Sequence, residues 1–226
     1  MNITDIQKRI ARKATIYIST KTPTNNYIGR VPFCLPDEQI PKDIDNNNMN
    51  PLLFLDLSFL SNSSSVLKDY SNIAIFISKD IFDHLDNING YFKIRTYGKN
   101  QKLNESYYPA HPELMPMFLK DKVVENDYPV WDGNDIDSKV LDAICEIEDQ
   151  EDKDYYEDIV EEIYTAHKIG GYGSYIQGGY DFDNGYEYAM QVVSDDLAKF
   201  NIVDGGNLYF AYNKQKKDWQ AYCDFY

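Results

Sequence analysis

Short apolar runs separated by turn-forming residues constrain the fold of this chain more than any other feature. The runs are rich in β-branched and aromatic side chains, as buried and half-buried strands are. Clusters of proline, glycine and asparagine between them interrupt any longer regular element. The clearest runs are "LLFLDLS" (52–58), "NIAIFIS" (72–78), "GYFKIRTY" (90–97), "YAMQVVS" (188–194) and "NLYFAYN" (207–213). We therefore predict an α+β fold with a mainly antiparallel sheet. Residues 99–134, which hold four prolines, are expected to be loop-rich.

The two ends of the chain resemble each other. "YIGRVPFCLP" (27–36) resembles "KIGGYGSYIQ" (168–177), and each is followed by two apolar runs at similar intervals. Such an order predicts an internal duplication of a β unit. We expect a single domain, residues 1–226, with pseudo-repeats at about 27–80 and 168–226.

Helical periodicity is found in two places. Ile3, Ile6 and Ile10 recur at helical spacing, with Thr4 or Asp5 available to begin a helix. An acidic segment, residues 134–162, begins a second helical region.

Two apolar stripes run through that region, one ending at Ile147 and one at Ile163, which predicts an acidic helical pair. Asp135 or Asp137 is a suitable N-cap for the first helix. The pair of glycines at 170–171 is expected to end the second helix, with the preceding His-Lys pair in its last turn.

The distribution of charge limits the partners of the chain. The net charge is −15, and residues 134–162 carry 13 acids against two lysines. Nucleic-acid binding depends on clustered basic residues, so this balance argues against a nucleic-acid partner. A basic protein partner fits the acidic segment, and a solvated helix face explains it equally.

Cysteine and histidine usage points to no cofactor or metal. The three cysteines form no CxxC pair, and the three histidines show no zinc-ligand spacing. "DFDNGYE" (181–187) misses the register of a calcium loop by one residue, and its Asn-Gly pair predicts a turn before a strand. Without a signal-peptide core or a run of 18 apolar residues, a cytoplasmic location and no membrane association are expected.

The glycine-rich stretch at 166–188 holds most of the candidate site residues. His167 is a candidate general base, because imidazole titrates near neutral pH, and it is equally suited to a helix end. The glycines lack the GK[ST] ending of a phosphate loop and fit tight turns instead. Asp204 suits a turn, and Trp219 suits either core closure or an aromatic contact surface.

"HKIGGYGSYIQ", "MQVVSDD", "VDGGNLYFAY" and "WQAYCDFY" together resemble the YwqG-like family of uncharacterised bacterial proteins. The resemblance is specific over residues 166–226 and looser over 28–80. It departs at Gly173, where the family has proline, and at Ile202 and Val203, where it has Trp-Gly. The resemblance implies a mixed α+β fold with an internal repeat, a bacterial cytoplasmic setting, no established activity, and the immunity or partner-binding role of some relatives.

Two functions follow as hypotheses, beside a structural module with no dedicated ligand. The first is a non-enzymatic protein-binding module, immunity-like, that binds a basic partner through residues 134–162 and the tyrosines of the glycine-rich stretch. The alternative is a small-molecule-binding or hydrolytic enzyme with its site around His167. The candidate binding residues are His167, Lys168, Tyr172, Tyr175, Gln177, Asp195, Asp204 and Trp219.

Overall fold

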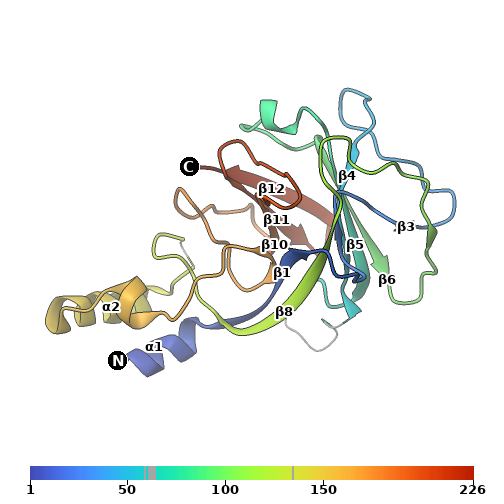
Figure 1. Cartoon of the computed structure of the whole chain (residues 1–226). Coiled ribbons are helices and arrows are strands. Elements are labelled where there is room, and N and C mark those ends of the chain that lie inside the picture. The colour runs from blue at the N-terminus through green and yellow to red at the C-terminus, as the bar shows by residue number, and fades with distance from the viewer. Residues whose placement is uncertain (59, 61–64, 134) are drawn as a thin grey trace.

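A single antiparallel sheet forms most of the molecule. The computed structural model describes residues 1–58, 60, 65–133 and 135–226. The sheet strands are β1 (Arg12–Thr20), β2 (Tyr27–Ile28), β4 (Asn50–Asp56), β5 (Tyr70–Ile77), β6 (Phe92–Gly98), β8 (Met117–Asp127), β9 (His167–Gly170), β10 (Glu187–Val193), β11 (Asn207–Asn213) and β12 (Asp218–Asp224). Their spatial order is β12-β11-β10-β9-β1-β8-β2-β4-β5-β6 (Figure 1). The short strands β3 (Phe33–Cys34) and β7 (Asn104–Glu105) pair separately, and η2 (Ile81–Asp83) is a single 3₁₀ turn. The prediction of a mainly antiparallel α+β fold is confirmed.

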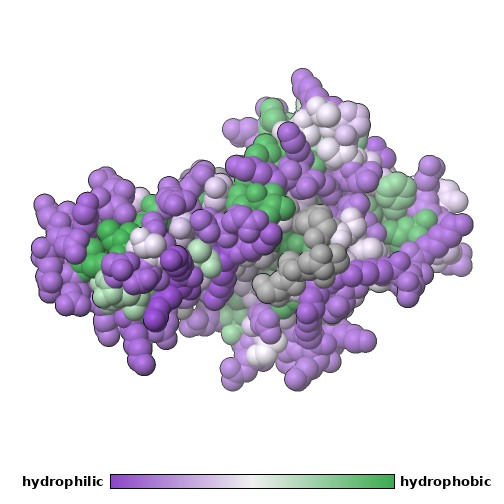
Figure 2. Space-filling view, turned by 90° about the horizontal axis from the view of Figure 1, so that it is seen from below, coloured by the Kyte–Doolittle hydropathy of each residue, from purple (hydrophilic) through white to green (hydrophobic). Residues whose placement is uncertain are grey.

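The helices gather at one end of the molecule (Figure 1). They are α1 (Ile3–Ile10), α2 (Ser138–Glu151) and a single π-helical turn, η3 (Tyr155–Ile159). Ile6, Ile144 and Ile159 are fully buried where these elements pack together. We call α1, α2 and residues 152–162 the helical lobe. Its surface is covered mainly by hydrophilic residues, around an apolar patch (Figure 2). No helix in the described part of the chain is both long and apolar enough to span a membrane.

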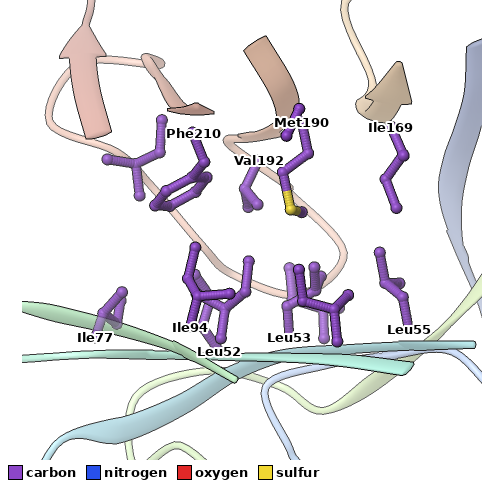
Figure 3. Close-up of a cluster of buried hydrophobic side chains, with 14 of the residues drawn as sticks. Leu52, Leu53, Leu55, Ile77, Ile94, Ile169, Met190, Val192 and Phe210 are labelled. Carbon is purple, nitrogen blue, oxygen red and sulfur yellow. The ribbon is translucent and has the colours of Figure 1, made fainter. Parts of the chain in front are cut away.

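The main core lies between the two flanks of the sheet, which is nearly closed. Side chains from β9, β10 and β11 face those from β4, β5 and β6 across this layer (Figure 3). Phe210, Val192, Leu52 and Leu53 are fully buried there. Burial of each such side chain contributes roughly 1.5–3 kcal/mol, so the predicted apolar runs are the strands that enclose the core.

Both helix starts depend on a side-chain cap. The Asn2 side chain accepts a hydrogen bond from the Asp5 amide at 2.9 Å, so the N-cap of α1 lies two residues before Thr4 and three before Asp5, the two residues expected to begin the helix. Asp137 caps α2 by accepting from the Lys139 amide at 3.0 Å, as predicted.

The predicted second helix of the acidic pair forms only a single turn in the structure, so the prediction is wrong beyond that turn. Asp152 adopts a left-handed conformation, with φ of 53°, at the end of α2, and η3 spans five residues. A longer helix would place Glu157 beside Glu161 and Asp158 beside Glu162. Like charges four residues apart disfavour such an extension by roughly 0.2–0.5 kcal/mol a pair, although α2 itself contains one such pair, Asp142 and Glu146.

The placement of His167 and Lys168 in a last helical turn is also wrong. Both residues lie in β9, which pairs with β1 on one side and β10 on the other. Gly170 and Gly171 do have positive φ values, 70° and 65°, but they end a strand. The loop-rich reading of residues 99–134 likewise missed β8, the 11-residue strand that pairs with most of β1.

Candidate functional site: the glycine-rich loop and its supports

The glycine-rich loop, residues 171–186, connects β9 to β10 and folds back against the sheet. Tyr172, Ser174 and Tyr175 are buried, whereas Gln177 is exposed. A buried loop must satisfy its backbone amides, because an unpaired buried N–H costs as much as a lost hydrogen bond. Polar side chains from several strands supply those partners.

A fully buried ion pair holds the start of this loop. The Lys168 Nζ donates to Asp127 Oδ1 at 3.0 Å, to Asp127 Oδ2 at 2.9 Å, and to the Tyr164 carbonyl at 3.1 Å. Asp127 Oδ2 also accepts from the Tyr172 amide at 2.8 Å. Burial raises the pKa of Asp127 and lowers that of Lys168, while the attraction between the two charges opposes both shifts. Lys168 is therefore a structural partner of Asp127.

There is no space for a side chain at position 171, because Gly171 lies against the Asp127 carboxylate of that pair. Its φ is 65°, and a Cβ atom there would lie 2.1 Å from Asp127 Oδ2. Only glycine combines this backbone conformation with such close approach of a carboxylate.

His167 is buried in a second polar cluster. Its Nδ1 accepts from the Val193 amide at 3.1 Å, so Nε2 carries the proton and faces Asp195 Oδ2 at 3.2 Å. Asp195 also accepts hydrogen bonds from the Ser19 hydroxyl and the Ala198 amide. Burial raises the pKa of Asp195, but the hydrogen bonds from His167, Ser19 and Ala198 outweigh it and hold that pKa below its ordinary value.

This second cluster lacks the order of a catalytic triad. In a triad the imidazole lies between hydroxyl and carboxylate and accepts the hydroxyl proton. Here the Asp195 carboxylate lies between Ser19 and His167, so the imidazole contacts no hydroxyl in this cluster. His167 is 3% exposed, and both ring nitrogens have partners. The arrangement joins the ends of β1, β9 and β10.

Gln191 on β10 supports the middle of the glycine-rich loop. Its Oε1 accepts from the Ser174 amide at 2.9 Å. Its Nε2 donates to Ser174 Oγ at 2.7 Å and to the Ala166 carbonyl at 2.9 Å. Its Oε1 also accepts from the Tyr188 hydroxyl at 3.3 Å, so this fully buried side chain joins the loop at Ser174 to β10 and to the residue before β9.

Asp224 on β12 supports the far end of the loop. Its Oδ2 accepts from the Ile176 amide at 2.8 Å, and its Oδ1 accepts from the Tyr209 hydroxyl at 2.9 Å. Asn207 donates to the Tyr209 oxygen at 2.9 Å and to the Ser174 carbonyl at 3.1 Å. The first half of the loop, residues 172–177, is therefore held by side chains from β8, β10, β11 and β12.

The remaining candidate residues do not converge on one point. Tyr175 packs on Tyr209, with ring centroids 4.6 Å apart, and Trp219 packs on Tyr212 at 4.7 Å. The Gln177 side chain donates to a backbone carbonyl near the C-terminus, and Asp204 lies exposed in the turn before β11. Trp219 thus closes the core.

Three hollows lie beside the loop. One, of about 270 Å³, has Ser174, Tyr175 and Ile176 in its lining. The largest of the three, about 520 Å³, is lined by β1 and β9 and has Arg12, Lys13 and Glu187 at its sides. The smallest, about 220 Å³, shares Asp135 and Tyr188 with the largest. Among the predicted site residues only Tyr175 lines any of them. No group of three or more His, Cys, Asp or Glu side chains gathers around a metal position in the described residues.

The family model for DUF1963, a domain of unknown function, matches residues 28–223. The chain belongs to this DUF1963 family. No curated protein matches the chain. The DUF1963 match extends from β2 into β12, so it includes both flanks of the sheet, α2 and the glycine-rich loop, and it leaves out α1 and β1.

Sequence reasoning missed the residues that support the loop in this DUF1963 domain. Asp127, Gln191, Asn207, Tyr209 and Asp224 lie on strands, without a catalytic or metal-binding motif. All but Asp127 stand in the segments that resemble the YwqG-like family, where their role was not recognised. Their burial is the property that marks them, since a buried polar side chain needs a specific partner. The one available signal was a polar residue inside an apolar run, as Gln191 is in "YAMQVVS".

Proposed function

We propose that this DUF1963 protein is a non-enzymatic protein-binding module whose helical lobe binds a basic protein partner. The observation that carries the proposal is the charge of the segment that contains α2 and residues 152–162. Residues 134–162 carry a net charge of −11, and the helices project from one end of the sheet (Figure 1). Residue 134 itself lies outside the described residues, and it is uncharged.

The packing of the lobe supports this proposal. Because the apolar stripe of α2 is buried against α1 and η3, its acids face outward. The helix α1 changes the balance little, with one acid, Asp5, against Lys8 and Arg9. The exposed acids of residues 135–162 are Asp137, Asp142, Glu146, Asp149, Glu151, Asp152, Asp154, Glu157, Asp158, Glu161 and Glu162.

The burial of His167 supports a binding role over hydrolysis. A general base must come within about 3 Å of a substrate proton, and both nitrogens of this ring already have partners inside the protein. Lys168 is likewise engaged with Asp127. The acidic surface, in contrast, is open to solvent.

A dense acidic surface attracts a basic partner from a distance and accelerates association, and added salt screens this attraction. A basic toxin is one such partner, for which the chain would act as an immunity-like protein. With this role we propose membership of the YwqG-like group of bacterial proteins and a cytoplasmic location. An organelle or secreted form in the source cells would contradict the location.

Capture experiments test the lobe directly. Tagged wild-type protein is incubated with lysate of its own cells at low and high salt, beside a lobe variant in which three exposed acids are neutralised. The lobe variant is Asp142→Asn, Asp149→Asn and Glu157→Gln. A control variant removes the same charge elsewhere, by Asp37→Asn, Asp86→Asn and Asp204→Asn.

The proposal predicts a basic protein that wild type and control retain at low salt. High salt and the lobe variant should both release it. A partner retained equally by the lobe variant would refute the assignment of the surface. Capture insensitive to salt would refute its electrostatic basis.

We further propose that the sheet arose by duplication of one β unit. From the central β1–β8 pair, β9, β10 and β11 follow on one side as β2, β4 and β5 follow on the other. Gly29 and Gly170, which match in the two repeats, have φ values of 79° and 70°. This correspondence supports a single domain with pseudo-repeats at 27–80 and 168–226. Profiles built from many family sequences should align the two halves with these glycines in register; a failure to align them would contradict it.

A further inference from the structure

The smallest of these hollows has an unusual lining. Five aromatic side chains and two carboxylates contribute to its wall, in a volume of about 220 Å³. The carboxylates are Asp135, beside the start of α2, and Asp181, in the glycine-rich loop. No basic side chain is among the described residues that line it. The aromatic residues are Tyr175, Tyr180, Phe182, Tyr186 and Tyr188.

The two carboxylates are only partly neutralised. Asp135 is half-buried and forms an ion pair with the Arg12 guanidinium at 3.8 Å, beyond hydrogen-bond distance, and Asp181 is exposed. Burial raises the pKa of Asp135; Arg12 lowers it, and the charge of Asp181 raises it further. A cation placed in the hollow would relieve both the burial of one charge and the repulsion between two.

Two of the aromatic rings pack on rings that are not part of the lining. Tyr180 stacks on Tyr222 with ring centroids 4.0 Å apart and an angle of 7° between the planes. Tyr175 packs on Tyr209 at 4.6 Å, with the ring planes tilted by 35°. Rigid ring faces attract cations without a cost in side-chain entropy.

The chain already uses this interaction beside the hollow. The Arg12 guanidinium lies 4.0 Å from the centroid of Tyr172, and the Lys216 ammonium lies 5.0 Å from that of Tyr186. Tyr186 is itself a lining residue, so one ring of the wall already takes part in a cation–π contact.

We propose that this hollow binds an organic cation, an alkylammonium or guanidinium head group, between the aromatic rings and the two carboxylates. A hydrated metal ion fits less well, because calcium takes six to eight oxygen ligands and the walls are mainly aromatic. A free amine and a lysine or arginine side chain of a protein both carry the required group. The site does not depend on the helical lobe binding a partner.

Titrations followed by ligand-observed NMR test the site with defined probes. Tetramethylammonium and Nα-acetyl-arginine amide supply the two head groups, and Nα-acetyl-norleucine amide is the uncharged control. Both cations should bind and the norleucine derivative should not. A short arginine-containing peptide distinguishes the sources: tighter binding than the free amide indicates a protein side chain, and equal binding indicates a free small cation.

Substitutions at exposed wall residues should leave the fold intact. Asp181→Asn should weaken binding of both cations about threefold, as expected for a partly screened charge. Tyr180→Leu keeps an apolar wall but removes the π face, and should weaken binding about fivefold. Asp86→Asn, which removes a charge in another loop, is the matched control and should have no effect.

Absence of binding by either cation would overturn the proposal. Binding that neither Asp181→Asn nor Tyr180→Leu changes would place the cation elsewhere and overturn it as well. The lobe variant described above should bind both cations as wild type does, so failure of this site and failure of the lobe as a docking surface are separate results.

Discussion

Replacing Lys168 with methionine should destabilise the protein strongly, because it leaves a buried charge unpaired. The Asp127 carboxylate has no exposed surface and would lose two hydrogen bonds of 2.9–3.0 Å, keeping the bond from the Tyr172 amide. Removing one partner of a buried ion pair costs about 3–5 kcal/mol. This is a large fraction of the roughly 5–15 kcal/mol that stabilises a typical domain.

A second substitution should recover part of this loss. Asp127→Asn removes the charge but keeps an oxygen that can accept from the Tyr172 amide. In the double variant Lys168→Met/Asp127→Asn no charge remains buried, so we expect a loss of no more than about 2 kcal/mol. The two single losses should therefore add to more than the loss of the double variant.

Urea unfolding followed by tryptophan fluorescence measures these free energies, since Trp131 and Trp219 lie in different parts of the fold. Coincident transitions at the two probes would show that the lobe and the sheet unfold together. A loss of unfolding free energy below about 1 kcal/mol for Lys168→Met would refute the reasoning, because removing the cation from a buried, paired carboxylate should destabilise the protein more than that.

Three further predictions concern the loop, its pH dependence and the thiols. Gly171→Ala should cost about 2–3 kcal/mol more in unfolding free energy than Gly205→Ala, because both sites have positive φ but only the first would clash with a carboxylate; equal losses would contradict the clash. Asp195→Asn should lose about 1–2 kcal/mol at neutral pH. Since folding lowers the pKa of Asp195, its contribution is complete above an ordinary carboxyl pKa of about 4 and is lost as pH falls below it, so the difference from wild type should shrink there; a difference that grows with acid would contradict the sign. Under native conditions a thiol reagent should modify Cys145 alone, because the other two cysteines are buried; modification of all three would contradict the packing.

The apolar strands were predictable from the sequence, and the charged strand was not. β4, β5, β10 and β11 bury most of their side chains, so their composition alone marks them. β8 exposes most of the side chains in its charged middle, and "KDKVVEND" therefore resembles a solvated loop. Its position in the sheet comes from pairing with β1, which depends on contacts distant in sequence.

The candidate site was likewise predictable from the sequence only in part. The residues of the glycine-rich loop were identified, but the reading of His167 and Lys168 as a helix end depended on local spacing. The hydrogen-bond partners of these two side chains are distant in the sequence. Asp127 lies 41 residues from Lys168, and Asp195 lies 28 residues from His167. One factor that disfavours a longer second helix was present in the sequence, as acids four residues apart.

Hydrogen exchange on the complex tests the central claim most directly. With the captured partner bound, amide exchange should slow on α2 and on residues 155–162, and the sheet strands should be unchanged. Protection confined to the edge strands β6 or β12, with the helical lobe exchanging as in the free protein, would contradict the account.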